Sequence, residues 1–134
     1  MIALLPRFGR AASIGPLSSV LETGGEILSW DAGQALAKHP HDAAREALQR
    51  AAGSPRKWTA IAAVDGLAAR GDRAACATLR STATDHSDHG VRLHALSGAA
   101  RLGCYSQAEL QTLNQDPDSE VREVAGRHLA PEPR

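Results

Sequence analysis

An internal repeat of about 30 residues constrains this chain more than any other feature of its sequence. Val91, Ala95 and Ala99 lie at four-residue steps, and positions 121, 125 and 129 repeat this apolar pattern 30 residues later. Positions 59, 63 and 67 form a looser copy 32 residues earlier. Four-residue steps place side chains on one face of a helix. A repeated helical unit of this length is typical of an α-solenoid, in which each unit buries its apolar face against the next.

Glycine, proline and polar turn residues divide the chain into short segments with helical periodicity. They predict helices near residues 16–22, 25–38, 41–52, 56–70, 73–83, 89–102, 106–114 and 119–129. The chain is 43% apolar but only 3% aromatic, and much of the difference is alanine, the best helix former. No segment alternates apolar and polar residues over the length of a strand, so the expected class is all-α.

Two segments carry a resemblance to a known family. Residues 116–130, DPDSEVREVAGRHLA, resemble the first helix of a short, bilin-lyase-type HEAT repeat, whose pattern begins D-P-x-x-x-V-R. Residues 67–72, LAARGD, resemble the link between its helices. The resemblance covers residues 55–130 and, more weakly, 25–53. It implies a right-handed α-solenoid of about three to four HEAT-like helical hairpins with an N-terminal cap, and says little about function.

The alternation of helices gives an expected domain organisation. Counting back from residues 119–129 makes 41–52, 73–83 and 106–114 the second helices, which line the concave face of a solenoid. Residues 39–46 also resemble 116–123, which would make 41–52 a first helix, but three consecutive units favour the first order. We therefore expect a cap segment at 1–24, a repeat domain at 25–130 and a disordered tail at 131–134.

Charge and cysteine usage narrow the function classes. Fifteen Lys and Arg balance fifteen Asp and Glu, so the basic excess typical of nucleic-acid binding is missing. The apolar start Met1–Leu5 is shorter than a secretory core, and no stretch is long enough to span a membrane. Cys76 and Cys104 have no CxxC spacing, and reduced thiols in a cytoplasmic protein are the expectation.

The predicted binding surface is the polar strip on the second helices. Arginines suit bidentate pairing with carboxylates, so a protein partner with an acidic surface is expected. The predicted partner-binding residues are Arg45, Gln49, Arg73, Arg80, Gln107 and Gln111. A solvated helix face would look the same. The favoured function is a non-enzymatic protein-interaction module, such as an adaptor, an inhibitor or an assembly factor, with no catalytic residues, metal or cofactor.

Two alternatives of other classes remain. A metal-dependent or lyase-like enzyme would use the region of His86 and His89, where Asp85, Asp88 and His94 lie nearby, although the two aspartates also suit helix capping. A nucleic-acid-binding protein would need the arginines at 45, 50, 73 and 80 to converge on one strip.

The two tryptophans, Trp30 and Trp58, lie in or beside predicted first helices. Packing between repeats would bury them. Exposure would instead make one of them an anchor for a partner, because tryptophan is enriched among binding hot spots.

Overall fold

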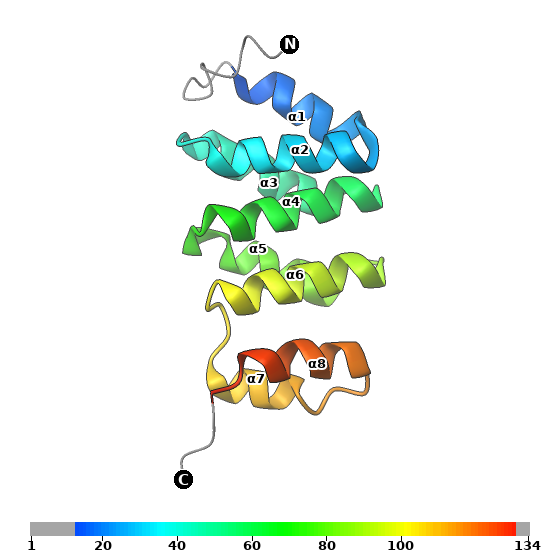
Figure 1. Cartoon of the computed structure of the whole chain (residues 1–134), viewed down its shortest axis with the longest axis vertical. Coiled ribbons are helices and arrows are strands. Elements are labelled where there is room, and N and C mark those ends of the chain that lie inside the picture. Colours follow the sequence, from blue (N-terminus) through cyan, green and yellow to red (C-terminus); the bar gives the residue numbers. More distant parts are fainter. Residues whose placement is uncertain (1–12, 131–134) are drawn as a thin grey trace.

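The computed structural model describes residues 13–130, which form helices and connecting turns without a strand (Figure 1). The helices are α1 (Ile14–Thr23), α2 (Gly25–Lys38), α3 (Asp42–Ala52), α4 (Lys57–Arg70), a 3₁₀ turn (Arg73–Ala75), α5 (Cys76–Asp85), α6 (His89–Arg101), α7 (Gln107–Leu113) and α8 (Ser119–His128). The predicted all-α solenoid of hairpins is confirmed, and the predicted helix bounds agree to within a few residues. Within the described part of the chain, no helix has the length and apolar character needed to cross a bilayer.

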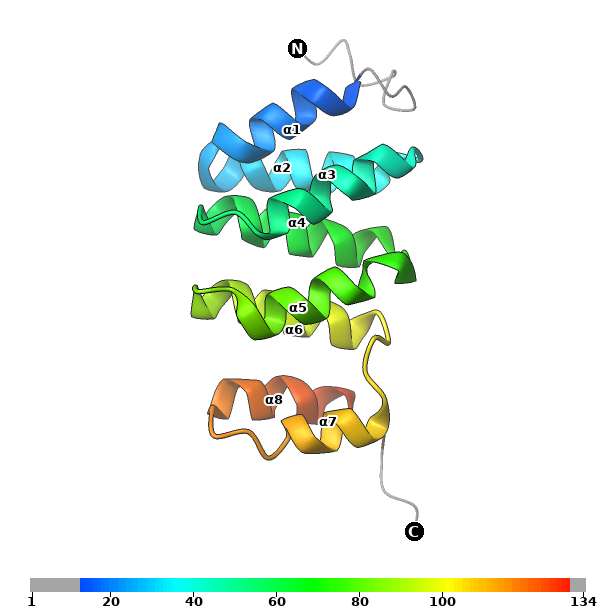
Figure 2. The same cartoon turned by 180° about the vertical axis from the view of Figure 1, so that it is seen from behind.

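The helices stack in two layers. α2, α4, α6 and α8 form one layer, here named the even layer, and α1, α3, α5 and α7 form the odd layer behind it (Figures 1 and 2). α3 packs mainly against α4, α5 against α6 and α7 against α8, while α1 packs against α2. The hairpins are therefore α1–α2, α3–α4, α5–α6 and α7–α8.

This pairing reverses the expected order of helices within a repeat. The helices with the Val-Arg pattern close their hairpins instead of opening them, so the alternation that we expected was wrong. Within the proposed cap, residues 14–23 form α1, which packs on α2 and also contacts α3 and α4. Residues 1–12 of that cap and the proposed tail at 131–134 lie outside the described residues.

Small residues let α2 and α4 approach closely in the even layer. A Cβ atom added to Gly66 would lie 2.8 Å from the carbonyl oxygen of Gly33, and one added to Gly33 would lie 2.7 Å from the carbonyl oxygen of Ala62. Neither distance is compatible with a side chain unless the backbones separate. The glycines therefore set the spacing between these two helices.

The core runs along the interface between the layers. Its largest fully buried side chains include Leu36, Leu48, Leu67 and Leu79, one from each of four successive helices. At the repeat positions, Val91, Ala95 and Ala125 are fully buried as predicted, whereas Val121 and Leu129 are only half-buried. α8 belongs to the last described hairpin, so it has a neighbouring hairpin on one side only.

Candidate interaction surface

The predicted arginine strip lies on the odd layer, where its first member is bound within the protein. Arg45 on α3 donates from Nη1 to Oδ2 of Asp72 at 2.8 Å, and its side chain is only 20% exposed. Asp72 also accepts from the backbone amide of Ala74, and this bond, followed by the Arg45 pair, lowers the pKa of the Asp72 carboxyl. Arg45 therefore joins the second hairpin to the third.

The other arginines of the strip also bond to residues 29 positions ahead. Arg73 donates to the carbonyl oxygen of Leu102, the C-cap of α6, at 3.2 Å, and so ties the two ends of the third hairpin together. Arg80 pairs with Glu109 and lies 4.9 Å from the centroid of the Tyr105 ring. The pKa of Glu109 is lowered, first by the backbone amide of Ser106 and then by Arg80. Arg80 thus joins the third hairpin to the fourth.

The three glutamines of the predicted set take no part in these arginine contacts. Gln107 accepts from the backbone amide of Ala130 at 2.7 Å, which ties α7 to the end of α8. Gln49 is half-buried on α3, and Gln111 is exposed on α7. The structure places all six residues on the odd layer, and their role in partner binding stays a prediction.

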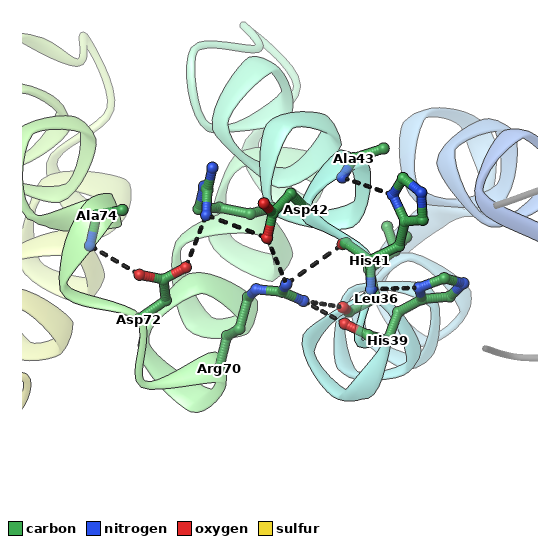
Figure 3. Close-up of polar contacts among 9 residues, drawn as sticks. Leu36, His39, His41, Asp42, Ala43, Arg70, Asp72 and Ala74 are labelled. Atoms are coloured by element: carbon green, nitrogen blue, oxygen red, sulfur yellow. Dashed lines mark hydrogen bonds and ion pairs between the residues drawn. The ribbon is translucent and has the colours of Figure 1, made fainter. Parts of the chain in front are cut away.

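Arg70, which the sequence reasoning did not single out, makes the densest polar contacts (Figure 3). It extends from the end of α4 to the end of α2, where its guanidinium donates to the carbonyl oxygens of Leu36, His39 and His41. The carbonyls of Leu36 and His39 lie at the C-terminus of α2, where positive charge is favourable, and His41 is the N-cap of α3. Arg70 follows His39 by about one repeat length, and this spacing was the feature of the sequence that could have predicted the contact.

A hollow on the even layer is lined by both tryptophans. Trp30 on α2 and Trp58 on α4 are 48% and 41% exposed, and Ile27 beside them is 74% exposed. Together with the buried residues Ile61 and Ala62 of α4, they line a hollow of about 340 Å³. We call it the tryptophan hollow. The expectation that repeat packing buries these rings was wrong, and the alternative of exposed rings is confirmed.

Carboxylates surround the tryptophan hollow. Glu26, Asp31 and Asp65 are among its lining residues, and the only basic side chain in that lining is His94 of α6. Nδ1 of His94 lies 3.1 Å from Oδ1 of Asp65, and this bond raises the pKa of the imidazole. The hollow therefore combines exposed aromatic faces with an acidic border.

Hydrogen bonds and ion pairs between residues about one repeat apart join successive hairpins in this structure, as is typical of stacked repeat units. The family model for HEAT repeats matches residues 16–100 and 48–130. The chain belongs to the HEAT-repeat family. No curated protein and no solved structure is significantly similar to it. HEAT repeats commonly serve as scaffolds for protein interactions, which agrees with the predicted class of function.

The histidines of this HEAT-repeat chain are largely turn and capping residues. Nδ1 of His86 accepts from the backbone amide of Asp88 at 3.0 Å, and Nε2 lies 2.8 Å from the carbonyl oxygen of Ser54. A carbonyl can only accept, so Nε2 carries the proton and both ring nitrogens are occupied. His39 and Asp116 likewise accept from the amide two residues ahead. Asp88 caps α6 by accepting from Val91, as predicted.

The alternative in which His86 and His89 together hold a metal is not supported, because both ring nitrogens of His86 are already hydrogen-bonded. Among the described residues, the potential ligands that converge are instead His89, Asp118 and Glu120, whose atoms lie within 4.8 Å of one another. Nε2 of His89 lies 2.6 Å from Oδ2 of Asp118, whose other oxygen accepts from the Glu120 amide and so caps α8. The first of these bonds, then the second, lowers the pKa of Asp118. This group is explained by helix capping and by contact between repeats.

The expectation of two reduced thiols was wrong. Cys76 and Cys104 form a disulfide, with their Cα atoms 5.4 Å apart. The bond joins the start of α5 to the link between α6 and α7. The two residues are 28 positions apart. A separation close to the repeat period brings equivalent ends of neighbouring repeats together, and this was the signal that the sequence offered. Because the two cysteines are bonded to each other, they no longer support the expected cytoplasmic location.

Proposed function

We propose that this HEAT-repeat protein is a non-enzymatic protein-interaction module that binds its partner through the tryptophan hollow on the even layer. One observation carries the proposal. The exposed large apolar side chains of the described residues all come from the first two hairpins, and both tryptophans of the chain are among them. They are Val20, Ile27, Leu28, Trp30 and Trp58. Three of them, Ile27, Trp30 and Trp58, line the same hollow. Exposed apolar surface of this kind favours a binding site, and tryptophan is enriched in hot spots.

The proposal moves the binding surface away from the arginine strip. Arg45 and Arg80 already pair with carboxylates of neighbouring repeats, so an acidic partner would have to displace Asp72 and Glu109 first. The same pairing weakens the case for nucleic-acid binding, because these arginines are not available to phosphates. The occupied ring nitrogens of His86 weaken the case for an enzyme in that region.

Affinity capture with matched variants tests the proposal. The full chain and its Trp30→Ala, Trp58→Ala, Arg73→Glu and Arg50→Glu variants are immobilised, and proteins retained from host extract are quantified. Arg50 is an exposed residue of α3 on the odd layer, which makes it a control for a change of charge. We expect a protein that the parent and the arginine variants retain equally and that both tryptophan variants lose.

Two results would contradict this. Loss of the retained protein with Arg73→Glu but not with Trp30→Ala would place binding on the odd layer, as the sequence first suggested. Equal retention by every variant would exclude both surfaces. Circular dichroism of each variant, with an unchanged helical spectrum, shows that a lost interaction is not a lost fold.

A further inference from the structure

The lining of the tryptophan hollow indicates the chemistry of what it binds. Its floor is apolar, since Ile61 and Ala62 are 6% and 1% exposed, and its sides are the rings of Trp30 and Trp58. Its volume of about 340 Å³ is large enough for several side chains of a partner. The apolar surface alone would accept many occupants. The charges at its border narrow the choice.

Three carboxylates line the hollow, and they come from two helices. Glu26 and Asp31 are exposed on α2, and Asp65 is half-buried on α4. No lysine or arginine is among the lining residues, and the one histidine is already bonded to Asp65. An anionic partner would be repelled here. A cationic group is attracted, and the attraction grows as the apolar surfaces around it exclude water.

The indole rings themselves favour a cation. Nζ of Lys57 lies 5.2 Å from the centroid of the Trp58 ring, so that ring already has a cation of this protein beside it. No such contact involves Trp30 in the described part of the chain, which makes Trp30 the ring that can receive a partner's cation. A cation–indole contact becomes stronger when it is desolvated. A carboxylate beside an aromatic face adds direct ion pairing to this attraction. A lysine or arginine side chain, with its apolar stem and cationic end, suits both parts of the lining.

The hollow continues across a third helix. A neighbouring hollow of about 400 Å³ shares Trp30, Asp65 and His94 with it and reaches Ser97 and Arg101 on α6. The two together form a groove over α2, α4 and α6, in which the basic Arg101 lies on α6 and the carboxylates Glu26 and Asp31 lie on α2, on the other side of α4. The acidic part that attracts a cation is therefore the part at α2. A chain segment, and not a single small cation, fills such a groove.

We propose that the groove binds a segment of a partner protein in which a lysine or arginine, flanked by apolar residues, inserts its cation between Trp30 and the carboxylates of α2, Glu26 and Asp31. The proposal rests on the proposed function, because it specifies the partner's chemistry at the same surface. It commits to a basic, partly apolar peptide.

Peptide libraries of matched composition test the inference on the full chain. Each library holds acetylated heptapeptide amides with random Leu, Ile, Ala and Ser, and the central residue is lysine, norleucine or glutamate. Peptides retained by the immobilised protein are quantified by mass spectrometry. We expect the lysine library to be retained about tenfold better than the norleucine library and the glutamate library to be lost, with an advantage that declines as salt is raised.

Variants separate the inference from the proposed function. The double variant Glu26→Gln/Asp31→Asn should abolish most of the preference for lysine, whereas Glu46→Gln, which removes an exposed carboxylate from α3, should not. Trp30→Ala should abolish retention of every library. If norleucine peptides bind as well as lysine peptides and still require Trp30, the cation inference is overturned and the binding surface stands. If the parent and Trp30→Ala retain the peptides equally, both the cation inference and the proposed binding surface are overturned. If the parent retains no library, the cation inference alone is overturned.

Discussion

Gly66→Ala should destabilise the protein although alanine is the better helix former. Gly66 lies in the middle of α4, facing α2, and an added Cβ would be 2.8 Å from the carbonyl oxygen of Gly33 and 3.1 Å from Cδ2 of Leu48. The leucine side chain can rotate away, but the carbonyl belongs to the backbone of α2. The two helices must therefore move apart, and the even layer loses packing along their whole contact.

The expected size follows from two opposing effects. Forcing extra volume into a well-packed interface costs roughly 1–3 kcal/mol. Replacing glycine by alanine within a helix recovers about 0.5–1 kcal/mol. The net loss should be roughly 0–2.5 kcal/mol, centred on about 1 kcal/mol, and for a chain of this length each kcal/mol lowers the melting temperature by roughly 3–5 °C.

Urea unfolding followed by circular dichroism measures this, with Gly126→Ala as the matched control. Gly126 is an exposed residue inside α8, and the nearest atom to a Cβ added there is Oδ1 of Asn114 at 3.4 Å, an ordinary contact. The control should gain a few tenths of a kcal/mol up to about 1 kcal/mol, so the two substitutions should differ in sign. If Gly66→Ala raises the unfolding midpoint as Gly126→Ala does, α2 and α4 do not approach as closely as the structure shows.

Three further perturbations have defined outcomes. Replacing Cys76 and Cys104 by serine should lower the stability by about 3–4 kcal/mol on loop entropy alone, measured by urea unfolding, and an assay of free thiols in the denatured parent should find none without reductant. The bond to Asp65 raises the pKa of the His94 imidazole. The stability that this bond adds is therefore complete below about pH 6.5 and is lost as the pH rises through the raised pKa. Unfolding midpoints should fall more between about pH 6 and about pH 8 in the parent than in His94→Gln. Leu129→Ala should cost less than the roughly 2–5 kcal/mol of a central leucine, since the side chain is half-buried, and an unchanged melting temperature would contradict the assigned helix register.

The sequence by itself determined the helices and their period. Several helix starts depend on residues close in the chain, such as Asp88 or Ser106 accepting from amides a few positions ahead, and a glycine or proline lies in every described break except the one between α5 and α6. The four-residue apolar steps predicted the inward side of α6, as the full burial of Val91 and Ala95 confirms, but on α8 they missed Val124, which is buried while Val121 is only half-buried. These are local properties, so one sequence is enough to read them.

The order of pairing within a repeat was not a local property. A helix in a stack of similar helices can pack against the one before it or the one after it, and the apolar pattern is compatible with both. Only the assembled structure showed that α3 packs mainly on α4, and hence that the Val-Arg helices close their hairpins.

The tertiary structure also decided what each polar or aromatic side chain does. Arg45 and Arg80 looked available for a partner until residues one repeat away supplied their carboxylates, and the same stacking brought Cys76 to Cys104. The tryptophans carry no local signal that separates burial from exposure. Their environment is set by the spacing and rotation of neighbouring helices, and these depend on contacts summed over the whole stack.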